Sequence, residues 1–176
     1  LESAVRKDRE AGLRPFLLVG TAGTTSTGSV DPLVDLAALA RRESLWFHVD
    51  GAYGGLFVLA PEAQEVLAGI DLADSVVVDP HKTLFLPYGT GAVLVRDVAD
   101  LRSTFATDAD YLAPRPDAEP PSPADLGPEL TRHFRAMRLW LPLQLAGRQA
   151  FSDALSEKIL LARYAHERLS RVPGIS

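Results

Sequence analysis

Residues 45–55 read LWFHVDGAYGG, and this stretch is the strongest indication of the fold in the sequence. The apolar run over 45–49 is typical of a strand buried within a sheet. The glycine-rich residues that follow it indicate a tight turn. Asp50 lies where the run ends, and an unpaired carboxylate beside an apolar strand is costly. We therefore expect Asp50 either to cap a following helix or to pair with a cationic group of a ligand.

Working outward from this stretch, further apolar runs predict strands over 16–20, 75–78 and 92–96. Between the first two strands, Asp31 and Pro32 predict the start of a helix, with Asp31 as the N-cap and Pro32 as the first helical residue. A short helix is expected near 61–68. The alternation of strands and helices through residue 96 indicates an α/β fold whose sheet is at least partly parallel.

The sequence changes character over residues 105–128, which are rich in proline and predict a long mobile loop. Residues 129–145 and 148–171 then predict two helices, the second of them strongly amphipathic. The chain after the loop is too short to form a second hydrophobic core. We therefore expect one domain over residues 1–176.

Composition narrows the possible functions. The 176 residues carry 18 Lys and Arg against 23 Asp and Glu, a net charge of −5, which argues against a nucleic-acid partner. The absence of Cys excludes a disulfide framework, a thiolate metal site and a Cys nucleophile. The apolar stretches are too short for a membrane span, and without an export signal we expect a cytoplasmic protein. Because the chain begins with Leu1 and its only Met is Met137, we expect a piece of a longer protein.

Polar residues follow three of the predicted strands. The first strand is followed by the hydroxyl-rich and glycine-rich loop TAGTTSTGS at 21–29, the second by Asp50, and the third by the stretch DPHK at 79–82. Ligands of open α/β sheets bind outside the carboxyl ends of the strands. We therefore expect these three segments to meet at one edge of the sheet.

Lys82 is the candidate nucleophile of this edge. It follows an apolar strand and precedes apolar residues, and partial desolvation favours the neutral, nucleophilic amine. The alternative interpretation is an ordinary surface lysine at the end of a strand. Taken together with Asp50, Lys82 provides the two groups that anchor pyridoxal phosphate (PLP), which are an amine for its aldehyde and a carboxylate for its ring nitrogen.

Other motifs fit the sequence less well. The loop at 20–28 lacks the Gly-Lys-Ser/Thr of a phosphate-binding P-loop and the glycine pattern of a dinucleotide site. His48, Asp50 and His81 could form a metal-binding trio, but no pattern of supporting residues accompanies them. A Ser-His-Asp triad would need a nucleophile elbow, which the sequence lacks. We therefore expect no metal site.

Four motifs in this order and spacing resemble the PLP-dependent amino-acid decarboxylases. They are TAGTT at 21–25, HVDGAYGG at 48–55, PHK at 80–82, with 32 residues from Asp50 to Lys82, and RHFRAMRLW at 132–140. The resemblance implies the large domain of a fold-type I enzyme, a mostly parallel sheet flanked by helices. It identifies this chain as the central and C-terminal part of that domain, leading toward a small domain that lies outside the sequence.

The resemblance also implies roles for individual residues. Lys82 would bind PLP through a Schiff base, and Asp50 would keep the ring nitrogen protonated. Ala52 would pack on one face of the ring, and Thr25 would lie near the cofactor. His81 would contact the phosphate or the reacting end of the cofactor.

Two further positions carry specific expectations from the resemblance. Asp79 occupies a cofactor-binding position at which relatives usually have an Asn that holds the phosphate, so Asp79 either weakens phosphate binding or points elsewhere. Residues 105–112 (FATDADYL) resemble the mobile catalytic loop of the family. Tyr111 of this loop would donate a proton to the substrate carbon after CO2 leaves. A Phe here is associated with aldehyde-forming relatives, so Tyr111 favours simple decarboxylation.

The expected function is therefore decarboxylation of an L-amino acid, preferably an aromatic one, to its amine and CO2. The alternatives are another fold-type I enzyme, such as a carbon–carbon lyase or an aminotransferase, and a non-catalytic truncated homologue. The resemblance implies a homodimer with sites at the interface, so this piece alone is expected to be inactive. Phe134, Leu139 and Trp140 would be core or dimer contacts, and Arg135 is not expected to reach the site.

Overall fold

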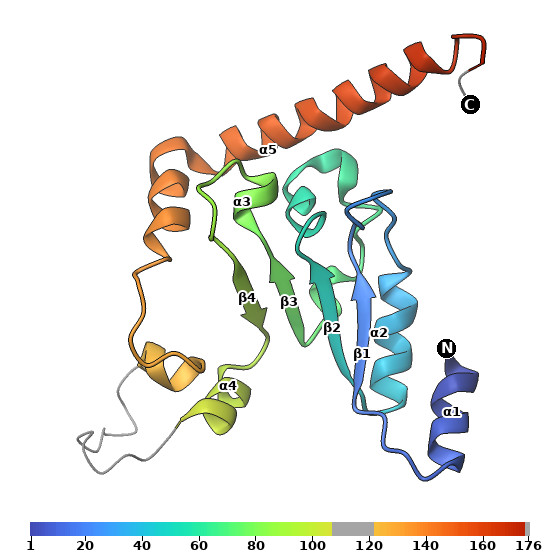
Figure 1. Ribbon diagram of the computed structural model, residues 1–176, viewed down its shortest axis with the longest axis vertical. Coiled ribbons are helices and arrows are strands. Elements are labelled where there is room, and N and C mark those ends of the chain that lie inside the picture. Colours follow the sequence, from blue (N-terminus) through green and yellow to red (C-terminus); the bar gives the residue numbers. More distant parts are fainter. Residues whose placement is uncertain (107–121, 175–176) are drawn as a thin grey trace.

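A four-stranded sheet organises the computed structural model, which describes residues 1–106 and 122–174 (Figure 1). The strands follow the order of the chain: β1 (Leu17–Thr21), β2 (Trp46–Gly51), β3 (Ser75–Val78) and β4 (Ala92–Val95). The first three are parallel, and β4 pairs antiparallel with β3. The predicted α/β fold is confirmed, and every predicted strand forms within two residues of its predicted bounds.

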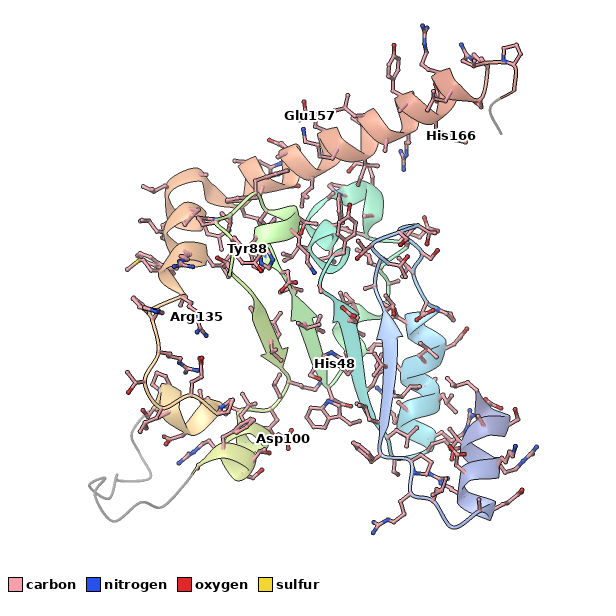
Figure 2. All side chains as sticks on the ribbon, in the orientation of Figure 1. His48, Tyr88, Asp100, Arg135, Glu157 and His166 are labelled. Atoms are coloured by element: carbon pink, nitrogen blue, oxygen red, sulfur yellow. The ribbon has the colours of Figure 1, made fainter. Side chains whose placement is uncertain are left out.

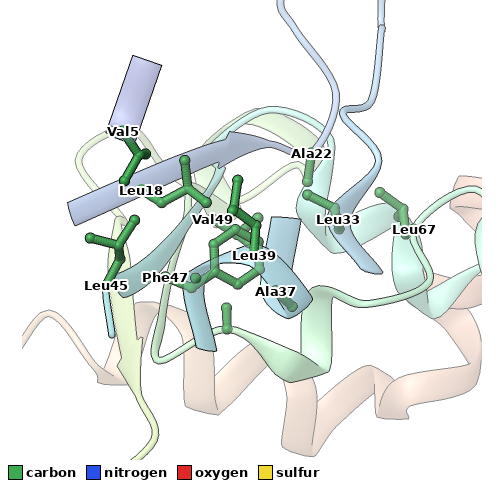
Figure 3. Close-up of a cluster of buried hydrophobic side chains, with 12 residues drawn as sticks. Val5, Leu18, Ala22, Leu33, Ala37, Leu39, Leu45, Phe47, Val49 and Leu67 are labelled. Carbon is green, nitrogen blue, oxygen red and sulfur yellow. The ribbon is translucent and has the colours of Figure 1, made fainter. Parts of the chain in front are cut away.

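One face of the sheet carries the core. Helix α2 (Leu33–Arg42) and the connection between β2 and β3 contribute to a single apolar cluster with the inward-facing side chains of β1 and β2 (Figure 3). Phe47, Leu33 and Val49 are among its largest fully buried members. Burial of such side chains stabilises the fold by roughly 1.5–3 kcal/mol each. Alternation along β2 therefore points Phe47 and Val49 into the core and Asp50 to the opposite face.

That opposite face is open in the part of the chain that the structure describes. Val19 of β1 is 49% exposed and Val93 of β4 is 62% exposed, although parallel strands are ordinarily covered on both faces. Asp50 lies on this face, opposite Thr21 of β1 and Val77 of β3 in the register. Its carboxylate is consequently accessible from the open side of the sheet.

Two local predictions about the helices that precede β3 are wrong. Helix α2 begins at Leu33 with Pro32 as its N-cap residue, because the Asp31 side chain does not cap the helix. Its Oδ2 accepts a hydrogen bond from the Thr21 amide at 2.8 Å instead, and this bond closes the loop after β1. The predicted helix near 61–68 is replaced by the 3-10 helix Pro61–Ala63 and the turns that follow it, and Leu67 of these turns is buried in the core.

The remaining elements lie outside the sheet and its core helix. They are α1 (Glu2–Glu10), η1 (Gly55–Leu59), η2 (Pro61–Ala63), η3 (Ile70–Leu72), α3 (Pro80–Thr83), α4 (Val98–Phe105), η4 (Pro123–Leu126) and α5 (Met137–Leu169). The described part of the chain contains no helix that is both long and apolar enough to cross a membrane.

Helix α5 consists of two helical segments that meet at Gly147, whose φ of 75° and ψ of 162° are not helical. The predicted break between two helices is therefore confirmed. The first helix begins at Met137 and not at 129, because Arg135 forms a bidentate ion pair with Glu129 and stabilises the preceding segment in a non-helical form. The hydrogen bond from Arg135 lowers the pKa of Glu129.

The second half of α5 crosses the end of the sheet at which the parallel strands terminate (Figure 1). Phe151 and Leu155 pack in a second apolar cluster with Leu84, the residue after α3. Ser156 Oγ donates a hydrogen bond to Glu62 Oε2 at 2.7 Å, and this bond lowers the pKa of Glu62. Helix α5 therefore fixes the position of the loops that follow β2 and β3.

Candidate active site

The carboxyl ends of β1, β2 and β3 lie at the same edge of the sheet (Figure 1). The loop that contains Thr25 follows β1, Asp50 and Ala52 follow the buried part of β2, and α3 with His81 and Lys82 begins two residues after β3. The expectation that the three polar segments share one edge is therefore confirmed. Tyr111 lies outside the described residues, so its role remains a prediction from the resemblance.

Two glycines hold the loop after β1 against the turn after β2. A Cβ added to Gly54 would lie 2.4 Å from the carbonyl oxygen of Ala22 and 2.7 Å from the Cα of Gly23. Gly23 itself has a φ of +91°, in the left-handed region that favours glycine. Only two residues without side chains allow the backbones to approach this closely. The contact fixes Thr25 relative to Ala52.

Replacing Gly54 by Ala is expected to lower the free energy of unfolding by about 1–3 kcal/mol, because the added methyl overlaps the Ala22 carbonyl. The measurement is equilibrium denaturation of the full-length protein. Gly127→Ala is the matched control, since neither Gly54 nor Gly127 has a positive φ and an added Cβ at Gly127 would meet only the flexible end of the Arg132 side chain, at 3.4 Å. An equal loss in the two variants would contradict a steric role for Gly54.

Hydroxyl groups order the loop after β1 from within. Thr24 Oγ1 and Thr27 Oγ1 lie 2.7 Å apart, and Thr27 Oγ1 lies 2.7 Å from Ser29 Oγ. The side chain of Thr25 lies outside this network and is exposed. Thr25 is thus free to contact a ligand at the edge of the sheet.

Asp50 has an incomplete set of partners. Its Oδ1 accepts a hydrogen bond from the Ala52 amide at 3.1 Å, so the carboxylate orders the turn. It does not cap a helix, because the next helical turn begins at Gly55. Among the described residues, no Lys, Arg or His forms an ion pair with Asp50. A carboxylate in this state fits a ligand that carries a positive charge.

Lys82 forms an ion pair with Asp79, with 2.7 Å between Nζ and Oδ2. The Lys82 side chain is 38% exposed, so it is neither buried nor fully solvated. The structure therefore places Asp79 against the candidate nucleophile. Whether Asp79 weakens phosphate binding or points away from the phosphate stays a prediction.

His81 has a defined tautomer. Its Nδ1 lies 2.8 Å from the carbonyl oxygen of Thr90, which can only accept, so Nδ1 carries the proton of this hydrogen bond. The Tyr88 ring contacts the imidazole edge-to-face, with 5.3 Å between the centroids. The sequence predicted only a glycine-rich turn here, because nothing local pairs residue 81 with residues 88 and 90.

The alternative metal trio does not form. His48 Nδ1 lies 2.7 Å from Ser75 Oγ, which also accepts a hydrogen bond from Trp46 Nε1 at 2.8 Å, so His48 belongs to a network within the sheet. In Figure 2 it lies well below Tyr88, away from the edge that carries Lys82. No group of three His, Cys, Asp or Glu residues within the described chain could hold a metal ion.

The donor set at this edge fits PLP. Lys82 provides a primary amine for an aldehyde, Asp50 provides a carboxylate without a cationic partner in the described chain, and the glycine contact keeps the adjoining loops in place. These groups match the two ends of a cationic pyridine ring that carries an aldehyde. Ala52 is only partly buried and can pack against such a ring.

Comparisons with known proteins identify the family of the chain. Residues 1–173 match the family described as the pyridoxal-dependent decarboxylase conserved domain. An aromatic-L-amino-acid decarboxylase from Bacillus atrophaeus is 38% identical over 97% of this chain and 36% of its own length. A 4-hydroxyphenylacetaldehyde synthase from Rhodiola rosea is 39% identical over 84% of this chain and 30% of its own length.

Solved structures of decarboxylases are also similar to this chain. The crystal structure of Catharanthus roseus tryptophan decarboxylase in complex with L-tryptophan superposes with a TM-score of 0.83 at 27% identity, covering 98% of this chain and 35% of that one. The chain thus spans about a third of the length of the relatives that it matches. By sequence, fold and the residues at its sheet edge, the chain belongs to the pyridoxal-dependent decarboxylase family.

Proposed function

We propose that the full-length protein decarboxylates an L-amino acid, preferably an aromatic one, to the corresponding amine and CO2, with PLP as its cofactor. The observation that carries the proposal is that one sheet edge holds both an amine, Lys82, and a carboxylate, Asp50, that has no cationic partner in the described chain. Membership in the pyridoxal-dependent decarboxylase family supports the reaction type.

PLP supplies an electron sink for the electron pair that CO2 leaves behind. Lys82 would hold the cofactor through Nζ and give way to the amine of the substrate. Asp50 would keep the ring nitrogen protonated by charge pairing, which is worth more at a site that excludes water than in bulk solvent. His81, Thr25 and Ala52 would position the cofactor from the adjoining loops.

The aromatic preference is supported by the names of similar proteins. The relatives from Bacillus atrophaeus and Catharanthus roseus are named for aromatic substrates, and a tyrosine decarboxylase from Arabidopsis thaliana is 32% identical. An aspartate 1-decarboxylase from Aliivibrio fischeri is 36% identical, so other substrates belong in the test.

The full-length protein should be incubated with PLP and single L-amino acids while amine and CO2 are quantified. Amine and CO2 in equal amounts from an aromatic substrate are expected, and no CO2 from any of them would overturn the proposal.

A second candidate is an aldehyde-forming reaction, because an aldehyde synthase from Rhodiola rosea is among the similar proteins. Tyr111 supports the amine-forming reaction, since the resemblance assigns it the proton donated to the substrate carbon. Tyr111→Phe is expected to lower amine formation by about 10²–10⁴-fold, the usual contribution of a positioned acid, while PLP still binds to Lys82. Chromatography of amine and aldehyde, with absorbance to follow the cofactor, tests this. Unchanged amine formation would contradict the role of Tyr111.

We also propose that the full-length protein is a homodimer. Phe134 is 73% exposed and Trp140 is 55% exposed, whereas Leu139 packs against the second apolar cluster. Of the three residues predicted as core or dimer contacts, Leu139 lies at the core, and Phe134 and Trp140 are available for a partner. Sedimentation of the full-length protein should give twice the monomer mass, and a monomer at micromolar concentration would contradict the proposal.

A further inference from the structure

The Asp79–Lys82 ion pair has a geometry that the proposed reaction does not require. Asp79 stands directly before α3, where a side-chain oxygen commonly accepts a hydrogen bond from the first turn. The Asp79 side chain makes no such bond, and its Oδ2 lies 2.7 Å from Lys82 Nζ. The carboxylate is therefore directed to the amine and not to the backbone of its own helix.

The turn before β4 supports the carboxylate from behind. A Cβ added to Gly91 would lie 3.0 Å from Asp79 Oδ1, closer than most real contacts, so a larger residue would push the carboxylate aside. The turn is itself fastened to α3, because the carbonyl oxygen of Thr90 accepts hydrogen bonds from both the amide and Nδ1 of His81. The Asp79 side chain is only 19% exposed, half the exposure of Lys82. Asp79 is thus the more buried member of the pair and is held from behind by the turn, and Lys82 is the more exposed member.

We propose that Asp79 is a positioning residue that restrains Lys82 as an ion pair until an aldehyde cofactor displaces it. The inference rests on the proposed function, because Lys82 must be the residue that takes up the cofactor. To react, the ammonium of Lys82 leaves Asp79 and loses one proton to solvent. The nitrogen lone pair then bonds to the aldehyde carbon, and the aldehyde oxygen leaves as water with the two remaining nitrogen protons. A carboxylate at hydrogen-bond distance stabilises the ammonium and therefore slows this step.

The test is the rate at which the full-length, cofactor-free protein takes up PLP and, separately, pyridoxal, which lacks the phosphate. The absorbance of lysine-bound cofactor reports uptake at fixed pH. Asp79→Asn keeps the shape of the side chain and removes its charge. Glu157→Gln is the matched control, because Glu157 pairs with Lys158 at 2.8 Å on the exposed surface of α5 and its loss changes the net charge equally.

Asp79→Asn is expected to speed the uptake of both compounds by roughly two- to fivefold, the range that partly exposed ion pairs contribute. The ratio of the uptake rate of Asp79→Asn to that of the unaltered protein should fall toward one in 1 M salt, where the screening length is about 3 Å. Glu157→Gln should leave both rates unchanged. Gly91→Ala, which displaces the carboxylate without removing it, should also speed uptake and gives a second test if Asp79→Asn does not fold.

The other possible results show whether the restraint by Asp79 or the proposed function fails. Faster uptake of PLP alone would show that Asp79 acts by repelling the phosphate, and equal or slower uptake of both compounds would overturn the restraint. If the unaltered protein forms no adduct on Lys82 with either compound, the proposed function fails together with this inference. If the unaltered protein forms the adduct on Lys82 at the same rate as Asp79→Asn, the restraint by Asp79 fails and the proposed function stands.

Discussion

Lys82→Ala is expected to abolish covalent PLP binding and the decarboxylase activity of the full-length protein. The amine at residue 82 lies at the edge where β1, β2 and β3 end, beside the loops that would hold the cofactor. The other two lysines of this chain are Lys7, in α1, and Lys158, in α5, and neither lies in the segments that follow β1, β2 and β3. Absorbance of lysine-bound cofactor and the rate of amine formation measure the two losses.

Lys158→Ala is the matched control for this prediction. Lys158 is 46% exposed and pairs with the neighbouring Glu157, so its removal takes away a lysine of similar exposure without touching the sheet edge. The control should retain both cofactor and activity. Retention of bound, active cofactor in Lys82→Ala would contradict the assignment of Lys82.

Asp50→Asn is expected to lower kcat by about 10²–10³-fold, the range seen when one preorganised electrostatic group is removed from an active site. The neutral amide cannot hold a proton on the ring nitrogen by charge pairing, so the electron pair left by CO2 is less well stabilised. The amide can still accept the hydrogen bond from the Ala52 amide, and the turn should therefore keep its form. Stopped-flow or steady-state amine formation measures the loss, and absorbance shows whether the cofactor is still bound.

Asp35→Asn provides the control for charge alone, since Asp35 is an exposed carboxylate on α2, a helix that packs on the opposite face of the sheet from Asp50. It should leave kcat unchanged. Equal activity of Asp50→Asn and the unaltered protein would exclude the ring-nitrogen role of Asp50.

The structural features that the sequence predicted correctly are those that depend on local patterns of residues. The strands at 75–78 and 92–95 follow from short runs of branched apolar residues, and the sequence also predicted separate helices on the two sides of Gly147. The order of the strands made the convergence of Lys82 and Asp50 at one edge predictable, because parallel strands bring their carboxyl ends together. These features need no knowledge of contacts between distant residues.

The remaining features depend on contacts that the sequence does not specify. Asp31 carries every local sign of an N-cap, yet it accepts a hydrogen bond from Thr21, which a bridge between Ala22 and Val30 brings close. The tautomer of His81 depends on the carbonyl of Thr90, nine residues away. The pairing of Asp79 with Lys82 depends on rotamer choice and on the turn at Gly91, so sequence alone could not separate it from phosphate binding.

The central claim is that Lys82 carries the cofactor, and borohydride reduction of the full-length protein with PLP tests it most directly. Reduction converts the labile linkage to a stable amine, and mass spectrometry of the digested protein then locates the added group. A pyridoxyl group is expected on the peptide that contains Lys82. A group on Lys7, on Lys158 or on a residue outside this chain, with Lys82 unmodified, would contradict it.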